Sequence, residues 1–224
     1  MKHRDPADLR NIMAAWNAML CVFSLWGSFR TAPHLLFRLT NETFRQTLCE
    51  DASTLWGSGA TGFWVQLFIY SKVIELGDTF FLVARKKKVM FLHWFHHVTV
   101  LLYCWYAYAY ETSQAQYFVA MNFSVHGVMY GYYCLMALKL PSFIPSFAIT
   151  VSQISQMVVG TLVQVFAFYY QFTATDPSSC NVHLPSTLGG LAMYAWYFLL
   201  FFQFALDRYF FKPRAAKAKA KRQD

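Results

Sequence analysis

The feature that most constrains this sequence is a long stretch almost free of charge. The 118 residues from Val89 to Leu206 contain three formally charged side chains, Glu111, Lys139 and Asp176. Over the whole 224-residue chain 57% of the residues are hydrophobic and 13% are charged, whereas an ordinary soluble domain has about 25% charged residues. A soluble core of this size could not bury so much apolar surface. We therefore expect an integral membrane protein, and not a disordered chain or a disulfide-rich secreted scaffold.

The apolar residues fall into segments long enough to cross a bilayer, which takes about 20 helical residues. Six spans are predicted: Asn11–Phe29, Ala60–Val83, Val89–Tyr110, Ala115–Leu138, Phe143–Tyr170 and Leu188–Phe211. The expected fold class is an all-α polytopic membrane protein. It would form a single transmembrane domain over residues 1–211, followed by a basic cytosolic tail over residues 212–224.

The basic residues predict the orientation of these spans. The net charge is +8, and six of the 19 basic residues lie in the last thirteen positions, while four more form the run Arg85–Lys88. Basic clusters beside hydrophobic spans are typical of cytosolic loops and tails. We expect both termini in the cytosol, basic segments that contact anionic membrane lipids, and no nucleic-acid partner.

The opposite, lumenal side would then receive residues 30–59, 111–114 and 173–187. Cys49 and Cys180 are the two cysteines in these loops, and an oxidising compartment would allow them to form a disulfide. Two free thiols are the alternative. Asn41-Glu42-Thr43 is a glycosylation sequon on the same side, so Asn41 is a candidate glycosylation site.

Four clusters of polar residues interrupt the predicted spans. Ionisable groups inside a membrane are costly and are therefore functional candidates. Helical rise places the clusters at similar depths in the cytosolic half of the protein, where they would line one chamber. The clusters are Lys72, Glu75, Asp78 and Thr79; His93, His96 and His97; Asn122, His126, Met129, Tyr130, Tyr132 and Tyr133; and Thr150, Gln153 and Gln156.

The histidines allow two kinds of chemistry. A di-iron site of the histidine-box type needs about eight ligands, but three of the seven histidines, His3, His34 and His183, fall outside the spans. We therefore expect no metal site, although a mononuclear zinc site remains an alternative. The second kind is nucleophilic and acid–base catalysis, because an imidazole titrates near neutral pH and can attack a thioester to form an acyl-imidazole.

Together the four clusters resemble the pattern of the very-long-chain fatty-acid elongase family, the membrane 3-ketoacyl-CoA synthases. They occur in the family's order and approximate spacing, and the similarity runs from Arg4 to near Phe211. The resemblance implies an acyltransferase that condenses a fatty acyl-CoA with malonyl-CoA to a 3-ketoacyl-CoA and releases CO2 and CoA. Its substrates would be CoA thioesters, with no further cofactor.

The resemblance also implies roles for individual residues. His96 would attack the acyl thioester in a ping-pong reaction, while His93, His97 and His126 would position the thioesters and move protons. A second set would bind substrate and hold the helices around a narrow acyl tunnel: Lys72, Glu75, Asp78, Asn122, Tyr130, Tyr133, Gln153 and Gln156.

Three further expectations follow from the resemblance. Family members have seven spans, so this chain would lack the family's first helix. It would reside in the endoplasmic reticulum membrane, and the ketoacyl-CoA reductase, dehydratase and enoyl reductase of the elongation cycle would be its partners. A metal-dependent lipid oxidase or hydroxylase and a non-enzymatic transporter remain the alternative functions.

Overall fold

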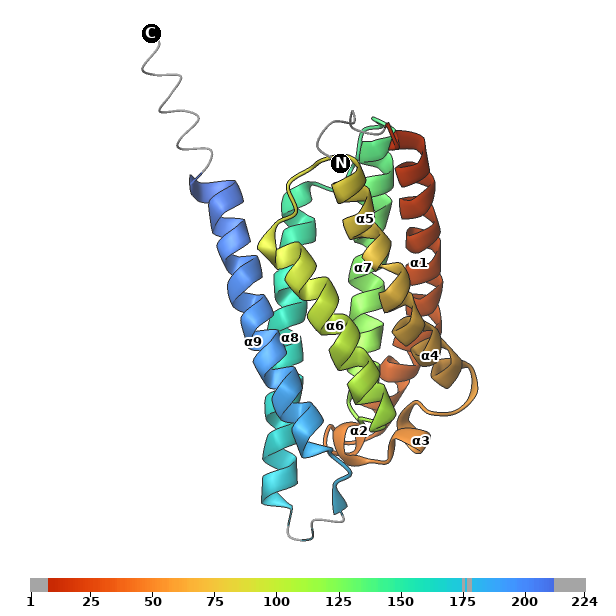
Figure 1. The fold of residues 1–224 in the computed structure, drawn as a ribbon. Coiled ribbons are helices and arrows are strands. Elements are labelled where there is room, and N and C mark those ends of the chain that lie inside the picture. The colour runs from red at the N-terminus through yellow and green to blue at the C-terminus, as the bar shows by residue number, and fades with distance from the viewer. Residues whose placement is uncertain (1–7, 175, 177–178, 212–224) are drawn as a thin grey trace.

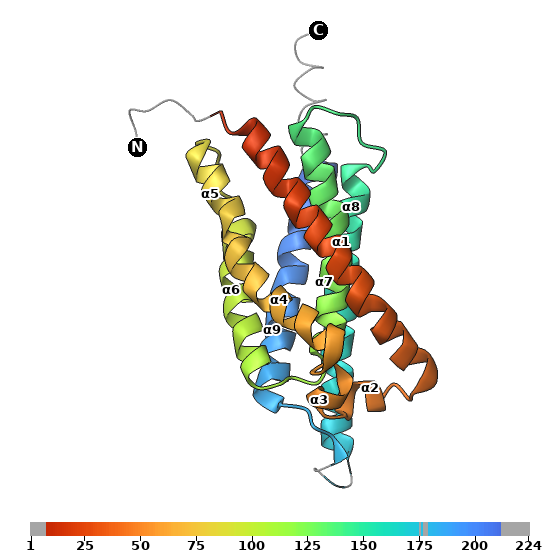
Figure 2. The same cartoon turned by 90° about the vertical axis from the view of Figure 1, so that its right-hand side faces the viewer.

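In the computed structural model, residues 8–174, 176 and 179–211 are described, and every regular element within them is a helix. The long helices form one bundle, and two short helices lie at one end of it (Figures 1 and 2). The predicted basic tail, residues 212–224, lies outside the described residues. In chain order the helices are α1 (Arg10–Asn41), α2 (Gln46–Cys49), α3 (Ala52–Leu55), α4 (Gly59–Ile74), α5 (Leu76–Ala84), α6 (Phe91–Ala109), α7 (Ala115–Ala137), α8 (Ser146–Thr173) and α9 (Leu184–Ala205).

Three helical stretches in the described residues are long and apolar enough to cross a membrane. They are α1, α8 and the continuous stretch Leu184–Phe211, in which a π-helical segment, Leu206–Phe211, extends α9. The all-α membrane fold class is thus confirmed, and the protein is a multi-pass membrane protein. Helices α4 to α7 lie in the same bundle (Figure 1), but their membrane crossing, and therefore the count of six spans, stays a prediction.

Two of the predicted segments differ from the observed helices. The first span was expected to end at Phe29, but α1 continues for twelve more residues to Asn41, through Pro33. Its backbone hydrogen bonds are internal, so the helix continues past the polar Arg30 and Thr31 into a second apolar stretch, even though a proline removes one bond. Asn41, the candidate glycosylation site, is therefore the exposed last residue of α1. The remaining span boundaries differ from the helix ends by up to four residues.

The second correction concerns the segment predicted as one helix over Ala60–Val83. It is broken at Glu75 into α4 and α5. At the break the Asp78 backbone N–H donates to the Glu75 carbonyl oxygen at 3.1 Å, a tight i to i+3 hydrogen bond. Such tight turns within a helix often mark a hinge, and this one falls inside a predicted polar cluster.

Packing brings distant parts of the sequence together, above all α1 and α7. Two glycines permit the close approach: a Cβ on Gly27 would lie 2.6 Å from the Phe123 ring, and a Cβ on Gly127 would lie 2.7 Å from Leu25 Cδ2. Each glycine thus accepts a large side chain from the facing helix, as small residues commonly do at membrane helix interfaces.

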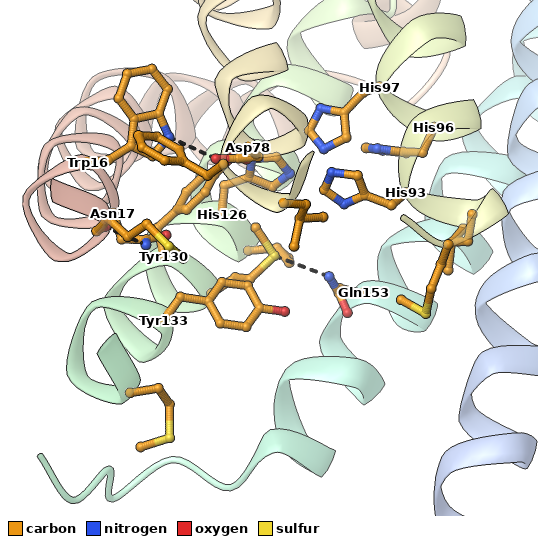
Figure 3. Close-up of a pocket in the computed structure, with 18 of the residues that line it drawn as sticks. Trp16, Asn17, Asp78, His93, His96, His97, His126, Tyr130, Tyr133 and Gln153 are labelled. Atoms are coloured by element: carbon orange, nitrogen blue, oxygen red, sulfur yellow. Dashed lines mark hydrogen bonds between the residues drawn. The ribbon is translucent and has the colours of Figure 1, made fainter. Parts of the chain in front are cut away.

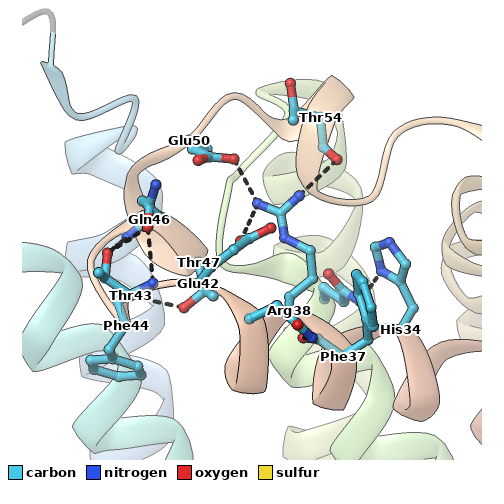
Figure 4. Close-up of polar contacts among 12 residues, drawn as sticks. His34, Phe37, Arg38, Glu42, Thr43, Phe44, Gln46, Thr47, Glu50 and Thr54 are labelled. Carbon is cyan, nitrogen blue, oxygen red and sulfur yellow. Dashed lines mark hydrogen bonds and ion pairs between the residues drawn. The ribbon is translucent and has the colours of Figure 1, made fainter.

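The two ends of the bundle differ in chemistry. At one end, called here the disulfide end, a disulfide joins Cys49 to Cys180. The buried Arg38 guanidinium also lies there, 2.6 Å from carboxylate oxygens of both Glu42 and Glu50 (Figure 4). The opposite end, called the basic end, carries the start of α1, the Arg85–Lys88 loop that follows α5, and the turn after α7.

Candidate active site: a histidine-lined chamber

A cavity of about 670 Å³ lies at the basic end among α1, α5, α6, α7, α8 and α9 (Figure 3). We call it the chamber. The predicted Lys72 and Glu75 lie behind its wall. Ten of the twelve predicted catalytic and substrate-binding side chains line it: Asp78, His93, His96, His97, Asn122, His126, Tyr130, Tyr133, Gln153 and Gln156.

The imidazoles gather on one side of the chamber because of helical periodicity. His93 and His97 are four residues apart on α6, and their ring centroids lie 4.6 Å from each other. The ring of His96 lies 5.4 Å from that of His97 and 4.9 Å from that of Tyr197 on α9. His126 enters from α7 (Figure 3). Four imidazoles therefore meet on one wall, at a density that permits both nucleophilic attack and proton transfer.

Behind this wall, a buried ion pair fixes the polar residues of two helices. Lys72 Nζ donates to Glu75 Oε1 at 2.7 Å and to Asn122 Oδ1 at 2.9 Å. The side chain of Lys72 is 1% exposed and that of Glu75 is 5% exposed. A desolvated charge pair persists only when its geometry is good and its hydrogen bonds are made. The pair thus ties the α4–α5 break to α7 and sets the direction of the Asn122 amide.

The Glu75 carboxylate also faces His126, and several polar atoms of this cluster have no hydrogen-bond partner among the described residues. His126 Nδ1 lies 3.9 Å from Glu75 Oε1, beyond hydrogen-bond length. Glu75 Oε2, His97 Nδ1 and His126 Nδ1 are buried with no hydrogen-bond partner among the described residues. Unpaired buried polar atoms cost free energy. Three of the seven such atoms found among the described residues lie beside this cavity, which makes the region a candidate for binding or transforming a ligand.

Asp78 is held by two donors from other helices. Trp16 Nε1 donates to its Oδ1 at 2.8 Å, and the Tyr130 hydroxyl donates to its Oδ2 at 2.7 Å. A Cβ on Gly77 would lie 2.5 Å from Trp16 Cζ2, so the glycine makes room for the indole. Trp16 was not predicted as a site residue, because an aromatic residue in an apolar helix is typical of packing.

The chamber also has cationic residues at its basic end that sequence reasoning treated only as markers of topology. Arg10 at the start of α1, Arg85 just after α5 and Lys139 after α7 all line it. All three lie at the ends of helices that line the chamber, and this shared position is the feature of the sequence from which their place in the site could have been predicted. Three cations from three elements make this end of the chamber suitable for an anionic group.

Gln153 and Tyr133 on the far wall make few side-chain hydrogen bonds among the described residues. Gln153 Nε2 contacts Met129 Sδ at 3.3 Å, a weak acceptor. Tyr133 lies beside it in the chamber (Figure 3). Among the described residues no three histidine, cysteine, aspartate or glutamate side chains are grouped so that they could hold a metal ion.

These features define a class of protein: a multi-pass helical membrane protein with a buried, imidazole-rich chamber that carries cations at one end. Comparison with known proteins agrees with that class. A family model described as "ELO: GNS1/SUR4 family" matches residues 1–219. The chain belongs to this family.

Curated relatives of this chain are named as fatty-acid elongases. The chain is 41% identical over 211 residues to "Very long chain fatty acid elongase 6" of Drosophila melanogaster, an alignment that covers 93% of this chain and 66% of the relative. It is 37% identical over 223 residues to the protein of that name from Gallus gallus, with 97% and 80% covered. "Fatty acid elongase 3" of Trypanosoma cruzi is 38% identical over 242 residues, with 97% and 79% covered.

Proposed function

We propose that the chain is a fatty-acid elongase that condenses a fatty acyl-CoA with malonyl-CoA in the chamber. The observation that carries this proposal is the group of four imidazoles on one chamber wall, in a chain whose relatives are named elongases. Imidazole is both a competent nucleophile for a thioester and a proton carrier near neutral pH. The two halves of a ping-pong condensation need those two properties.

In the first half, a ring nitrogen of His96 attacks the thioester carbonyl carbon of the acyl-CoA. The carbon–sulfur bond breaks, an acyl-imidazole forms, and the imidazole proton leaves with the thiolate as CoA. In the second half, malonyl-CoA loses CO2 and its carbon–carbon bonding pair becomes an enolate. The enolate carbon attacks the acyl carbonyl, the carbon–nitrogen bond breaks, and His96 takes up a proton as the 3-ketoacyl-CoA departs.

The surrounding residues support these steps in distinct ways. Because Asn122 Oδ1 accepts from Lys72, its amide N–H groups are available to stabilise a developing oxyanion. His126 faces the Glu75 carboxylate, which favours a proton on Nδ1 and leaves Nε2 as an acceptor. His93 and His97 would relay protons between these groups, and Tyr130, Tyr133, Asp78, Gln153 and Gln156 would orient the two thioesters.

The cations suit the diphosphate and phosphate of CoA. Arg10, Arg85 and Lys139 line the basic end of the chamber, and guanidinium groups bind phosphate oxygens in pairs. We therefore assign this end to the nucleotide of CoA and to the cytosolic side of the endoplasmic reticulum membrane. The ketoacyl-CoA reductase, dehydratase and enoyl reductase would use the product in turn.

The test is an assay of purified chain with labelled malonyl-CoA and a panel of acyl-CoAs. The wild type should yield 3-ketoacyl-CoA, and incubation with acyl-CoA alone should add one acyl group to the peptide that contains His96. His96→Ala should abolish both signals, whereas His183→Ala, outside the chamber, should keep them. An acyl group on another residue overturns the His96 mechanism. A wild type that makes no 3-ketoacyl-CoA from any acyl-CoA overturns the function, and stoichiometric iron would favour the oxidase alternative.

A further inference from the structure

A second cavity lies on the outer side of the chamber wall. It is an apolar groove between α5 and α6, with a volume of about 340 Å³. Its lining residues are Leu76, Thr79, Phe80, Val83, Trp94, His97 and Val98. The chemistry described so far does not use this groove.

Helix α5 forms a partition one helix thick between the two cavities. Its residues Asp78, Phe81 and Leu82 line the chamber together with Arg85, which follows the helix, at spacings of three, four and seven residues. The opposite helical face, Leu76, Thr79, Phe80 and Val83, lines the groove with the same spacings. No residue of α5 is buried, so little apolar packing would be lost if this partition moved.

His97 lines both cavities and therefore stands at their seam. The seam is crossed by a hydrogen bond between Thr79 Oγ1 on α5 and His93 Nε2 on α6, at 3.1 Å. The helix is broken at Glu75, where α4 ends and α5 begins, and such a break can serve as a hinge. Helix α5 is short, is preceded by the break at Glu75 and is held beside the histidines by the hydrogen bond between Thr79 and His93. These are the features expected of a helix that opens and closes a passage.

We propose that the groove is a lateral portal through which the hydrocarbon chain of the chamber's acyl-CoA passes between the chamber and the bilayer. This proposal rests on the elongase function. The groove adjoins the histidines at His97, its other lining residues are almost all apolar, and it belongs to a bundle in which three helical stretches are long and apolar enough to cross a membrane. Exposure of a hydrocarbon tail to water is unfavourable, and the cost grows with each CH2 group, so a route through the side of the bundle avoids that cost.

The first test fills the groove. Val83 on α5 is 46% exposed and lies outside the chamber, and Val151 on α8 is 43% exposed and lines neither cavity. In lipid vesicles, Val83→Trp should lower turnover of a long-chain acyl-CoA about fivefold and leave turnover of a short-chain acyl-CoA within about twofold. The matched Val151→Trp should change neither. Equal effects on both chain lengths, or no effect on the long chain, would overturn the portal.

The second test locates the chain directly and does not require turnover. An acyl-CoA with a diazirine near its methyl end should photolabel the groove residues Phe80, Val83, Trp94 and Val98, which do not line the chamber, and excess unlabelled acyl-CoA should remove that labelling. Labelling confined to chamber residues, or groove labelling that unlabelled acyl-CoA does not reduce, overturns the proposal, the latter because it indicates bulk membrane lipid only. If the wild type labels competitively but makes no 3-ketoacyl-CoA, the elongase function fails while the lateral passage of the acyl chain stands.

Discussion

The bundle buries polar side chains at two levels, and the two clusters are built differently. Towards the disulfide end, an amide cluster links side chains that are almost completely buried and connected in series: Gln114 Nε2 donates to Gln164 Oε1 at 3.1 Å and to Thr187 Oγ1 at 2.8 Å, and Gln164 Nε2 donates to the Tyr103 hydroxyl at 3.2 Å. Towards the basic end, the histidine and carboxylate cluster borders a cavity and holds buried atoms without partners.

The difference shows that buried polarity by itself does not indicate function. In the amide cluster the groups are uncharged and satisfy one another, which is what a structural network needs. Around Glu75 the groups are ionisable: one carboxylate oxygen binds Lys72, accepts from the Ser71 hydroxyl at 3.3 Å and faces His126, while the other has no hydrogen-bond partner among the described residues. Unused hydrogen-bonding capacity beside a cavity is therefore the feature that separates the candidate site from the scaffold.

The largest effect is expected at the ion pair. Glu75→Gln leaves the Lys72 ammonium buried without a counter-charge, with only neutral acceptors such as Asn122 to bind it, and breaking a buried pair in this way costs about 3–5 kcal/mol of stability. Because the carboxylate that faces His126 also becomes neutral, turnover per folded molecule should fall about 100-fold, or about 2.7 kcal/mol. Thermal unfolding and the malonyl-CoA assay measure the two effects.

A double variant that removes both charges separates the effect of the Glu75 carboxylate on activity from its effect on stability. Lys72→Met combined with Glu75→Gln removes both charges and should recover most of the stability, because the uncompensated ammonium is gone. Activity should stay low, since His126 still lacks a carboxylate. Recovery of full activity in the double variant would show that the pair only supports the fold.

Loss of the disulfide should lower the stability of the protein without a change in turnover. Replacement of both Cys49 and Cys180 by serine opens the link between positions 131 residues apart, and loss of such a bond costs about 2–5 kcal/mol. Turnover per folded molecule should remain within about twofold at low temperature. A selective loss of turnover with unchanged unfolding temperature would contradict the separation of the two ends.

The amide cluster should lose less than the ion pair, because its partners are redundant. In Gln164→Leu, Gln114 Nε2 keeps Thr187 and the Tyr103 hydroxyl keeps the Ser186 carbonyl oxygen. We expect a loss of about 1–2 kcal/mol and unchanged turnover per folded molecule, measured by the same two assays. A loss of turnover as large as that of Glu75→Gln would mean that the amide cluster belongs to the site.

Much of the candidate site followed from the sequence, because helical periodicity is regular and polar residues in an apolar span are conspicuous. The spacing of His93 and His97 brought their side chains onto one helix face, and the estimated depth brought His126 and Gln153 to the same level. The break at Glu75 was not predictable in this way, since hydropathy does not report on backbone hydrogen bonds. The continuation of α1 past Pro33 was missed for the same reason.

The contacts of Trp16 and Gln114 were not predicted, because each residue type is common at its place in the chain. Trp16 contacts a carboxylate 62 positions away, and nothing in its neighbours indicates that contact. Gln114 was assigned to a loop, yet it is completely buried and bonded to α8 and α9. Such roles depend on which helices lie side by side, and a single sequence does not contain that information.

The smallest effect should come from the missed residue Trp16. Trp16→Phe keeps an aromatic ring against Gly77 but removes the indole N–H that holds Asp78, while Tyr130 still donates to the other carboxylate oxygen. Stability should fall by about 0.5–1.5 kcal/mol, the net contribution of one hydrogen bond. Because Asp78 lines the chamber, we also expect KM for acyl-CoA to rise about threefold with kcat nearly unchanged.

A second substitution decides whether Trp16 acts through Asp78 or only through packing. Tyr130→Phe removes the other donor, so the double variant with Trp16→Phe should raise KM by more than the product of the two single effects, since Asp78 then has neither of these anchors. Purely multiplicative effects would mean that the indole contributes packing alone. In that case Trp16 would belong to the scaffold, and the contribution of α1 to the site would be limited to other residues such as Arg10.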